Sequence, residues 1–545
     1  MPRLPAWLKA VLLAIPGLLL VAALAIVALG WYVSRQVGSS GGELAPDMAA
    51  YDVRHTDLEV QVDPASESIR GRAVVTVDAV APADVFAIHL DDRLQVVAVR
   101  VDGDLADARH ADGVISVALD DPWPAGSRHR VGVEYGGAPK KALRAPWIDG
   151  FVWSETPSGE PWVGVTCEGD GADIWWPCKD HPSDEPDEGM DIALTVPEGL
   201  VGLSNGRPMG ETTNPDGTVT SRWRVGFPVN NYAVSIAVGP YVPVEEIYRG
   251  VDGSRHETIV FWAIPEHLEE ARRMWVQMPR ILEIFGRRFG EYPFFSDKLW
   301  VAHAPYLGME HQTLIAYGSD FTDNDYGFDW LLAHELAHEW WGNKVTASDW
   351  GDAWLHEGFA SYAEALIVLD TVGEAAYLDY MHTLEIRMTN DDPLIKGTNL
   401  ESMQGLSPDA YGKGAWVLHM LRYLLGDEAM TEILWRVADG DNPAACRFVT
   451  TNEFTTVTEE IAGRDLGWFW QRYLHTAELP LWSVTRTGDR VTVAWDDPSF
   501  EMPLPVEIDG RRELVAMAGG RAELTVDPQA EVVVDPEREI LANRP

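Results

Sequence analysis

Residues 334–338 are His-Glu-Leu-Ala-His, and residues 354–358 are Trp-Leu-His-Glu-Gly. On a helix, His334 and His338 lie one turn apart on the same face, so both imidazoles can bind one metal ion. Glu357, on a second helix, can supply a third ligand and leave the fourth position open to water. Glu335 lies between the histidines and can accept a proton from that water. The pattern therefore predicts a catalytic zinc site.

Two helices are predicted around these residues, over 329–341 and 353–369. The first carries apolar side chains at helical spacing and is followed by Gly342 and Asn343, which commonly end helices. The alternative interpretation is an ordinary buried helix whose histidines pair with neighbouring side chains. Burying two histidines and two glutamates without a metal would require many polar partners, which argues against it.

Composition narrows the class of protein and of partner. A chain of 545 residues is expected to form two to four domains. The net charge is −43, from 85 acidic and 42 basic residues, and this charge opposes binding to phosphate backbones. We therefore expect no nucleic-acid partner and attribute the acidity to a solvated surface.

The N-terminal region has the pattern of a membrane anchor. Ala10–Val33 comprises 24 residues without a charged side chain, which is long enough to cross a bilayer. Arg3 and Lys9 precede it, and this positive flank predicts a cytoplasmic N-terminus and an exported body on the periplasmic or extracellular face. A signal peptide cleaved near Ala28-Leu29-Gly30 is the alternative, but the length of the apolar run favours an uncleaved anchor.

The remainder of the chain alternates between strand-like and helical patterns. Residues 38–42, Gly-Ser-Ser-Gly-Gly, predict a short flexible linker. Side chains alternate with a period of two from residue 51 to about 244, which predicts an antiparallel sandwich or curved sheet. Helical patterns dominate to about residue 475, beginning with a helix over 266–289, and short alternating runs return after Leu481.

The chain contains three cysteines, Cys167, Cys178 and Cys446, and an odd number does not indicate a disulfide framework. A bridge between Cys167 and Cys178 and a pair of free buried thiols both remain open.

Several further stretches carry a family resemblance. They are residues 175–180 (Trp-Trp-Pro-Cys-Lys-Asp), 290–294 (Gly-Glu-Tyr-Pro-Phe), 308–311 (Gly-Met-Glu-His), 334–343, 354–362 and 411–415 (Tyr-Gly-Lys-Gly-Ala). In this order they resemble the gluzincin zinc aminopeptidases related to aminopeptidase N and leukotriene hydrolase. The resemblance runs from Tyr51 to beyond Pro480.

The resemblance implies an α+β multidomain fold: an N-terminal β-saddle, a thermolysin-like, mainly α catalytic domain and a small C-terminal β-sandwich. Too few residues follow Pro480 for the large helical domain of many members, so a short, bacterial-type member is expected. The expected units are an anchor and linker (1–45), an N-terminal β-domain (46–247), a catalytic domain (248–480) and a C-terminal β-sandwich (481–545).

The resemblance also implies roles for individual residues. They are His334, His338 and Glu357 as zinc ligands, Glu335 as general base, Tyr411 as hydrogen-bond donor to the oxyanion, and Glu310, assisted by Glu168, as the binding site for the substrate's free amino group. Three positions depart from the family pattern. His311 and His356 each replace an asparagine, and Thr166 replaces a glutamine.

The expected function is zinc-dependent removal of N-terminal residues from peptide substrates. A zinc endopeptidase and a catalytically dead, membrane-anchored peptide-binding protein are the alternatives. Retention of Glu335 beside all three ligands argues against the dead protein.

Overall fold

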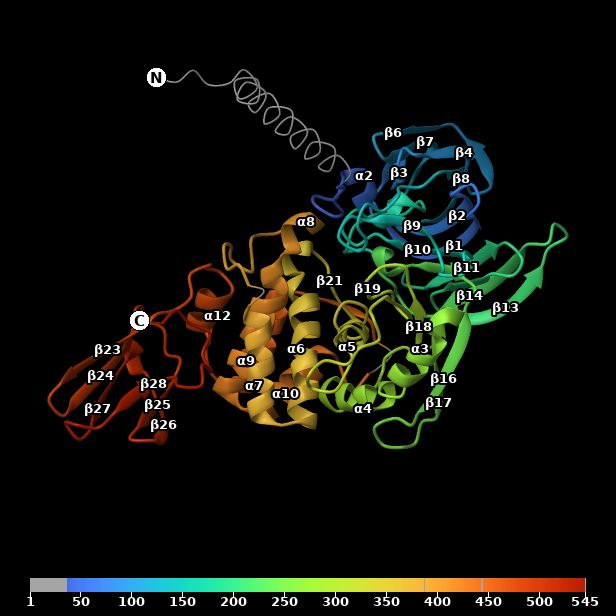
Figure 1. Cartoon of the computed structure of the whole chain (residues 1–545). Helices are drawn as coiled ribbons and strands as arrows, with labels where there is room; N and C mark the ends of the chain where they lie inside the picture. The colour runs from blue at the N-terminus through green and yellow to red at the C-terminus, as the bar shows by residue number, and fades with distance from the viewer. Residues whose placement is uncertain (1–36, 387, 443–444, 545) are drawn as a thin grey trace, which may run out of the picture.

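The computed structural model describes residues 37–386, 388–442 and 445–544 (Figure 1). The predicted anchor Ala10–Val33 lies outside these residues. Within the described part of the chain, no helix combines the length and the apolar character needed to cross a bilayer.

The N-terminal β-region is built on an eight-stranded sheet in the order β13-β14-β11-β1-β2-β8-β4-β5. Its strands are β1 (Tyr51–Asp63), β2 (Ser68–Ala79), β4 (Leu94–Val101), β5 (Asp104–Ala106), β8 (Arg128–Gly137), β11 (Met190–Val196), β13 (Arg207–Thr213) and β14 (Val219–Val225). The predicted alternation is confirmed in β1, where Leu58, Val60 and Val62 are all buried.

The alternation predicted from residue 51 to about 244 fails at Val97 of β4. Val99 is buried, whereas Val97 is 73% exposed. The pairing of β4 with β8 shifts register between Val96 and Ala98. Such a bulge changes which side chains face the core, because each one-residue slip turns the strand over.

Two smaller sheets complete this region, in the orders β3-β7-β6 and β12-β15-β10-β9. Their elements, with the adjoining helix and turns, are α2 (Pro46–Ala49), β3 (Ala83–His89), β6 (Ala108–Ala111), β7 (Val114–Trp123), β9 (Gly150–Glu155), β10 (Pro161–Thr166), η1 (Ala172–Ile174), β12 (Val201–Ser204), η2 (Asn231–Ala233) and β15 (Ile236–Gly239). Glu168 lies two residues after the end of β10.

A mixed five-stranded sheet in the order β16-β17-β18-β20-β19 leads into the helical region. Its strands are β16 (Val242–Tyr248), β17 (Glu257–Ala263), β18 (Trp300–His303), β19 (Gly308–Met309) and β20 (Leu314–Tyr317). The single helix predicted over 266–289 is wrong. The turn η3 (Pro265–His267) is followed by two helices, α3 (Leu268–Trp275) and α4 (Met278–Phe289). Pro279 lies in the first turn of α4. Because proline has no backbone N–H, it cannot donate the hydrogen bond that would continue α3.

Helices then dominate the chain (Figure 1). The elements are α5 (Trp330–Ala337), β21 (Val345–Ala347), η4 (Trp350–Asp352), α6 (Trp354–Thr371), α7 (Glu374–Glu385), α8 (Ser402–Gly405), α9 (Pro408–Leu425), α10 (Asp427–Val437), β22 (Arg447–Val449), α11 (Thr451–Ala462) and α12 (Gly467–Tyr473). Short strands β21 and β22 pair in parallel.

Two three-stranded sheets, β23-β24-β27 and β26-β25-β28, form the C-terminal region. Their elements are β23 (Trp482–Thr487), β24 (Arg490–Trp495), β25 (Leu504–Ile508), β26 (Arg511–Val515), η5 (Ala518–Gly520), β27 (Arg521–Thr525) and β28 (Val532–Val534). The predicted α+β class is therefore confirmed, with an N-terminal region of several sheets, a helical region and C-terminal strands.

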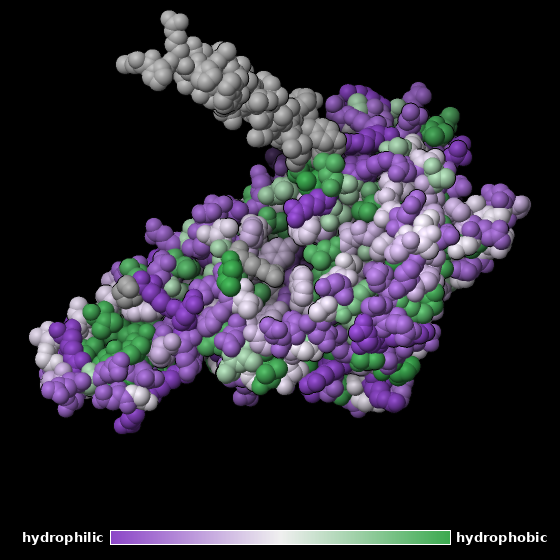
Figure 2. Space-filling view, viewed as in Figure 1, coloured by the Kyte–Doolittle hydropathy of each residue, from purple (hydrophilic) through white to green (hydrophobic). Residues whose placement is uncertain are grey.

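The hydrophobic core has two parts. One lies among the sheets of the N-terminal β-region, and the other joins the five-stranded sheet, the helices and the C-terminal strands. Trp340, Trp341, Trp350 and Trp354, which lie in or between the two predicted helices in the sequence, are all buried. The face shown in Figure 2 is mostly hydrophilic, in agreement with a solvated acidic surface.

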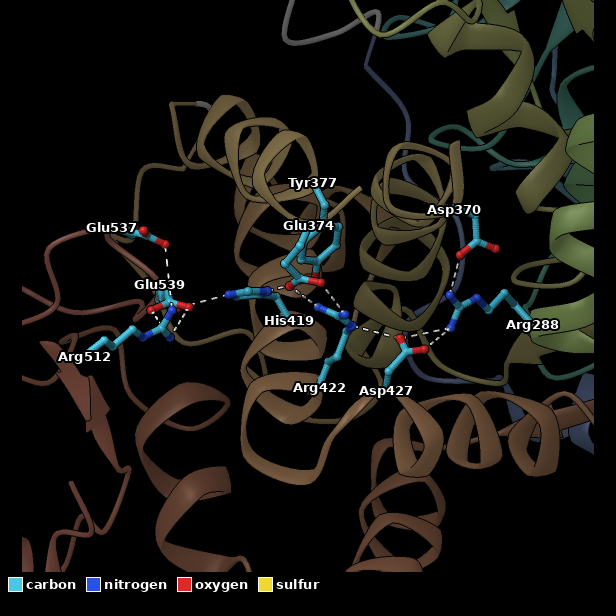
Figure 3. A network of polar contacts seen from close by, with 10 residues as sticks. All are labelled: Arg288, Asp370, Glu374, Tyr377, His419, Arg422, Asp427, Arg512, Glu537 and Glu539. Carbon is cyan, nitrogen blue, oxygen red and sulfur yellow. Dashed lines mark hydrogen bonds and ion pairs between the residues drawn. The ribbon is translucent and has the colours of Figure 1, made fainter. Parts of the chain in front are cut away.

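A network of ion pairs connects the ends of α6, α7 and α9 with α4 and α10 (Figure 3). Arg422 binds Glu374 through two nitrogens, each 2.8 Å from a carboxylate oxygen, and its Nε lies 2.9 Å from Asp427. Asp427 also pairs with Arg288 at 3.0 Å, and Arg288 pairs with Asp370 at 2.5 Å. Paired fork-shaped contacts of this kind fix the relative orientation of the helices.

The same network reaches the C-terminal strands through His419 of α9 (Figure 3). The imidazole of His419 bonds to the Tyr377 hydroxyl at 2.8 Å and to the backbone oxygen of Glu539 at 3.0 Å. Arg512 of β26 binds the Glu539 carboxylate at 2.6 Å. The C-terminal sheets are thus held against the helices that also carry Glu357 and Tyr411.

Candidate metal centre

Helix α5 presents His334 and His338. Asp329 caps the helix by accepting a hydrogen bond from the Leu332 backbone N–H at 3.1 Å. The helix ends at Ala337, four residues before the predicted end at Trp341. The chain turns there, and Trp341 forms a parallel β-bridge with Val345. His338 nevertheless keeps helical torsions, with φ −63° and ψ −19°. The one-turn spacing of the two imidazoles is therefore preserved.

The two imidazoles and the Glu357 carboxylate form a compact triangle of donor atoms. Nε2 of His334 lies 3.3 Å from Nε2 of His338, and these nitrogens lie 3.4 and 3.5 Å from Oε2 of Glu357. Bonds of about 2.0–2.1 Å in a tetrahedral zinc site imply donor separations of about 3.3–3.4 Å. The triangle fits a zinc-sized ion, and all three residues are buried.

The hydrogen bonds around the histidines leave the correct nitrogens free for a metal. Nδ1 of His334 lies 2.8 Å from Oε1 of Glu364, and Nδ1 of His338 lies 2.9 Å from the backbone oxygen of Trp341. Since both partners are acceptors, each Nδ1 carries the proton. Each Nε2 then has a lone pair directed at the triangle, as expected for oriented metal ligands.

Glu335 is buried next to the triangle. Its Oε2 has no hydrogen-bond partner among the described residues. Burial, reinforced by the Glu310 carboxylate, raises the pKa of Glu335 to about 8. A Cβ at Gly308 of β19 would lie 2.4 Å from Oε1 of Glu335, so the close approach of this strand requires glycine. The Glu335 carboxyl group therefore lies buried beside the position that a metal would occupy.

Three carboxylates converge beside the triangle. Oxygens of Glu168, Glu310 and Glu357 lie within 4.8 Å of one another. One oxygen of Glu168 and one of Glu310 have no partner in the described part of the chain. Burial and the neighbouring carboxylates Glu310 and Glu357 raise the pKa of Glu168 well above its usual range. A site of this kind is complementary to cations.

Glu310 follows β19, the edge strand of the five-stranded sheet. The strand that precedes β19 in the chain, β18, is an inner strand of the same sheet. An edge strand keeps backbone donors and acceptors available to an extended peptide. The carboxylate of Glu310 therefore lies at the end of an edge strand.

Tyr411 is brought to the site by a close crossing of α6 and α9. A Cβ at Gly358 would lie 2.8 Å from the Cα of Gly414, and the reverse distance is also 2.8 Å. Gly358 follows Glu357, and Gly414 lies one helical turn after Tyr411. The Tyr411 ring lies 6.0 Å from the ring of His334, nearly parallel to it. The two helices therefore approach each other closely at Gly358 and Gly414.

The other histidines considered in the sequence are not in the triangle. Nε2 of His356 accepts a hydrogen bond from the Ala347 backbone N–H at 2.8 Å. His419 belongs to the network of Figure 3, and His475 is exposed. His311 is buried, and burial lowers its pKa to about 3, so it is neutral. Thr166, the third departure from the family pattern, is buried at the end of β10.

Cys167 and Cys178 are both free and buried. The question left open by the sequence is thereby answered in favour of two thiols.

The helical region that carries the triangle is similar to a known protein family. Residues 277–473, which include the triangle, Glu310 and Tyr411, match the description "Peptidase family M1 domain". The chain contains a peptidase family M1 domain. The predicted family resemblance is thereby confirmed.

Relatives of the M1 domain carry aminopeptidase names. The chain is 26% identical to Leucine aminopeptidase 2 of Vanderwaltozyma polyspora, over 60% of this chain and 48% of the relative. It is 28% identical to Aminopeptidase N of Canis lupus familiaris, over 57% of this chain and 34% of the relative. The chain thus spans half or less of the length of these two relatives.

The fold also matches a solved structure. The M1 zinc metallopeptidase of Deinococcus radiodurans aligns with a TM-score of 0.67 and 24% identity, covering 82% of this chain and 97% of that one. The agreement extends well beyond the M1 domain, and it establishes the fold of most of the described chain.

Some residues of the M1 domain site were not predicted from the sequence. Glu364 orients His334, and its second oxygen accepts a hydrogen bond from Tyr380. Glu364 lies two helical turns after Glu357, so a search along the same face of α6 would have found it. The Trp341 carbonyl lies in the turn directly after His338, so its contact is local. Tyr232 reaches the site only through tertiary packing, and no local signal marks it.

Proposed function

We propose that the protein is a zinc-dependent aminopeptidase that hydrolyses N-terminal residues from peptides. The observation that carries the proposal is the pair of carboxylates Glu310 and Glu168, each with one oxygen that has no hydrogen-bond partner among the described residues, next to a complete metal triangle. An endopeptidase needs the metal and the base but has no use for a buried double-acid site. The names of the relatives, and the Tyr-Ser-Ala substrate bound to the Deinococcus radiodurans protein, support this proposal.

His334, His338 and Glu357 would hold the zinc. Zinc bound there would polarise the scissile carbonyl and make water more acidic. Glu335 accepts the proton of the attacking water and returns it to the leaving amine. The Tyr411 hydroxyl donates a hydrogen bond to the developing oxyanion. Glu310 and Glu168 bind the substrate's ammonium group, which determines that the first peptide bond reaches the metal.

The metal site gives the first prediction. Purified protein should contain about one zinc per chain, because three buried donors are arranged for tetrahedral binding. His338→Ala should lose that zinc, since two remaining donors cannot hold it. Elemental analysis measures both, and cleavage of aminoacyl reporter substrates with and without a chelator links the metal to turnover. Full zinc occupancy in His338→Ala would refute the assignment, and His475→Ala, at an exposed position, serves as the control.

We also propose that Ala10–Val33 anchors the body on the outer side of a membrane. The support is its charge-free length and the basic flank of Arg3 and Lys9. Cell fractionation should recover the intact chain with the membrane, and external protease should degrade its body. A soluble mature protein that begins near residue 31 would show instead that the segment is a cleaved signal peptide.

A further inference from the structure

The segment predicted to be a flexible linker, residues 38–42, is packed into the body, and we refer to it as the strap. Ser40 is 3% exposed, and its backbone N–H bonds to the Gly169 carbonyl at 3.0 Å and to Oγ of Ser402 at 3.1 Å. Its backbone oxygen accepts from the Ser402 N–H at 2.9 Å. The prediction of a flexible linker is therefore wrong for this segment.

The strap contacts the segment that carries Glu168. Gly169 is the next residue, and its carbonyl accepts hydrogen bonds from Ser40 and from the Ser402 hydroxyl. On the other side, Asp149 accepts from the Gly169 N–H at 2.7 Å and from the Asp170 N–H at 3.1 Å. The backbone directly after Glu168 is thus held between Asp149 and the strap.

A second line of contacts leads from the strap to Glu310. Gly41 has φ +83°, and a Cβ there would lie 2.5 Å from the ring of Trp350. The Trp350 ring packs on the ring of Tyr232 with centroids 5.7 Å apart. The Tyr232 hydroxyl is buried, has no hydrogen-bond partner in the described residues, and lies beside the Glu310 carboxylate. The glycines of the strap therefore provide positive φ and close approach rather than flexibility.

We propose that the strap is a positioning element of the amine-binding site, which holds Glu168 through Gly169 and Glu310 through Trp350 and Tyr232. This inference rests on the proposed aminopeptidase function. Its consequence is that the segment that follows the N-terminal anchor sequence also sets the preference for a free amino terminus. None of its residues contacts the metal ligands directly, so its effect should appear in amine selection and not in metal binding.

The test uses the full-length chain with Gly41→Ala. The readout is the ratio of kcat/KM for an aminoacyl anilide to kcat/KM for its N-acetyl form. Displacement of the two carboxylates by a fraction of an ångström should reduce this ratio about 10-fold or more, with the loss mainly in the free-amine substrate. Zinc content should stay at the wild-type level.

Gly126→Ala is the matched control. Gly126 has φ +84°, but a Cβ there meets no heavy atom within 4 Å, so this variant introduces the same backbone strain without a clash. It should keep the wild-type ratio. Ser402→Ala removes the hydroxyl that joins Ser40 to Gly169 and adds no bulk, and it should lower the ratio more weakly. If Gly41→Ala does not fold, the result for Ser402→Ala shows whether the strap positions the amine-binding site.

The outcomes separate the two proposals. If folded, zinc-loaded Gly41→Ala and Ser402→Ala keep the wild-type ratio, or lose activity on both substrates equally, the strap does not position the amine site. If the wild type itself cleaves the free and acetylated substrates equally, the aminopeptidase proposal fails, and the strap proposal fails with it.

Discussion

Glu335→Gln should retain zinc and lose at least ~10²-fold in turnover, the usual consequence of removing a general base. The amide has nearly the shape of the carboxylate, so the three donors of the triangle keep their positions. It cannot accept a proton from the attacking water at neutral pH. Gly308 of β19 passes close to this side chain, since a Cβ there would lie 2.4 Å from Oε1 of Glu335.

The measurement is single-substrate kinetics on the purified variant together with its zinc content. Glu283→Gln, on the exposed surface of α4, makes the same chemical change away from the site and should behave as the wild type. Loss of zinc in Glu335→Gln would make the kinetics uninformative about the base, so the zinc analysis is part of the result. Near-normal turnover with zinc bound would mean that another group activates the water.

Blocking the substrate's amino group should cost ~10- to 150-fold in kcat/KM, because a charge-assisted hydrogen bond shielded from water contributes about 1.5–3 kcal/mol. The ammonium group relieves the repulsion among Glu168, Glu310 and Glu357, whose oxygens lie within 4.8 Å of one another. Part of the loss should appear in kcat, since a substrate that is not held by its amino end places its carbonyl away from the metal.

Variants of Glu310 and Glu168 test this assignment. Glu310→Ala should reduce cleavage of an aminoacyl anilide strongly and that of its N-acetyl form little, so the two rates converge. Glu310→Gln keeps the side-chain shape and removes the charge, which separates electrostatics from packing. Glu168→Ala should act in the same direction more weakly, because Glu168 is less deeply buried than Glu310. Equal cleavage of both substrates by the wild type would leave a general zinc peptidase.

The metal triangle was predictable from the sequence because its geometry is local. His334 and His338 share one helix face, and Glu357 begins the next long helix. The amine site was not predictable in this way. Glu168 and Glu310 come from different sheets, and only the family resemblance indicated that they meet. Their convergence depends on the packing of the N-terminal β-region against the five-stranded sheet, which the periodicity of neither segment reveals.

The sequence-based predictions were wrong where one local sequence pattern is compatible with two different backbone conformations. Helical periodicity continues through residues 266–289, yet Pro279 divides the segment into α3 and α4. Alternation continues through Val97, yet a bulge in β4 exposes it. Glycines in residues 38–42 suit a flexible linker and equally suit a packed turn with positive φ. Tertiary partners, here Gly169 and Trp350, decide between the two.

The contact between Gly358 and Gly414 also bears on how such a site can diverge. A Cβ on either glycine would lie 2.8 Å from the Cα of the other. Any larger residue at either position would therefore push α6 and α9 apart. Glu357 and Tyr411 would then move apart together, and no second substitution on the partner helix can restore the contact, because nothing is smaller than glycine. Single substitutions therefore cannot change the distance between Glu357 and Tyr411 in small steps. New substrate preferences must arise instead in the loops and strand edges around them, which can vary without passing through an inactive intermediate.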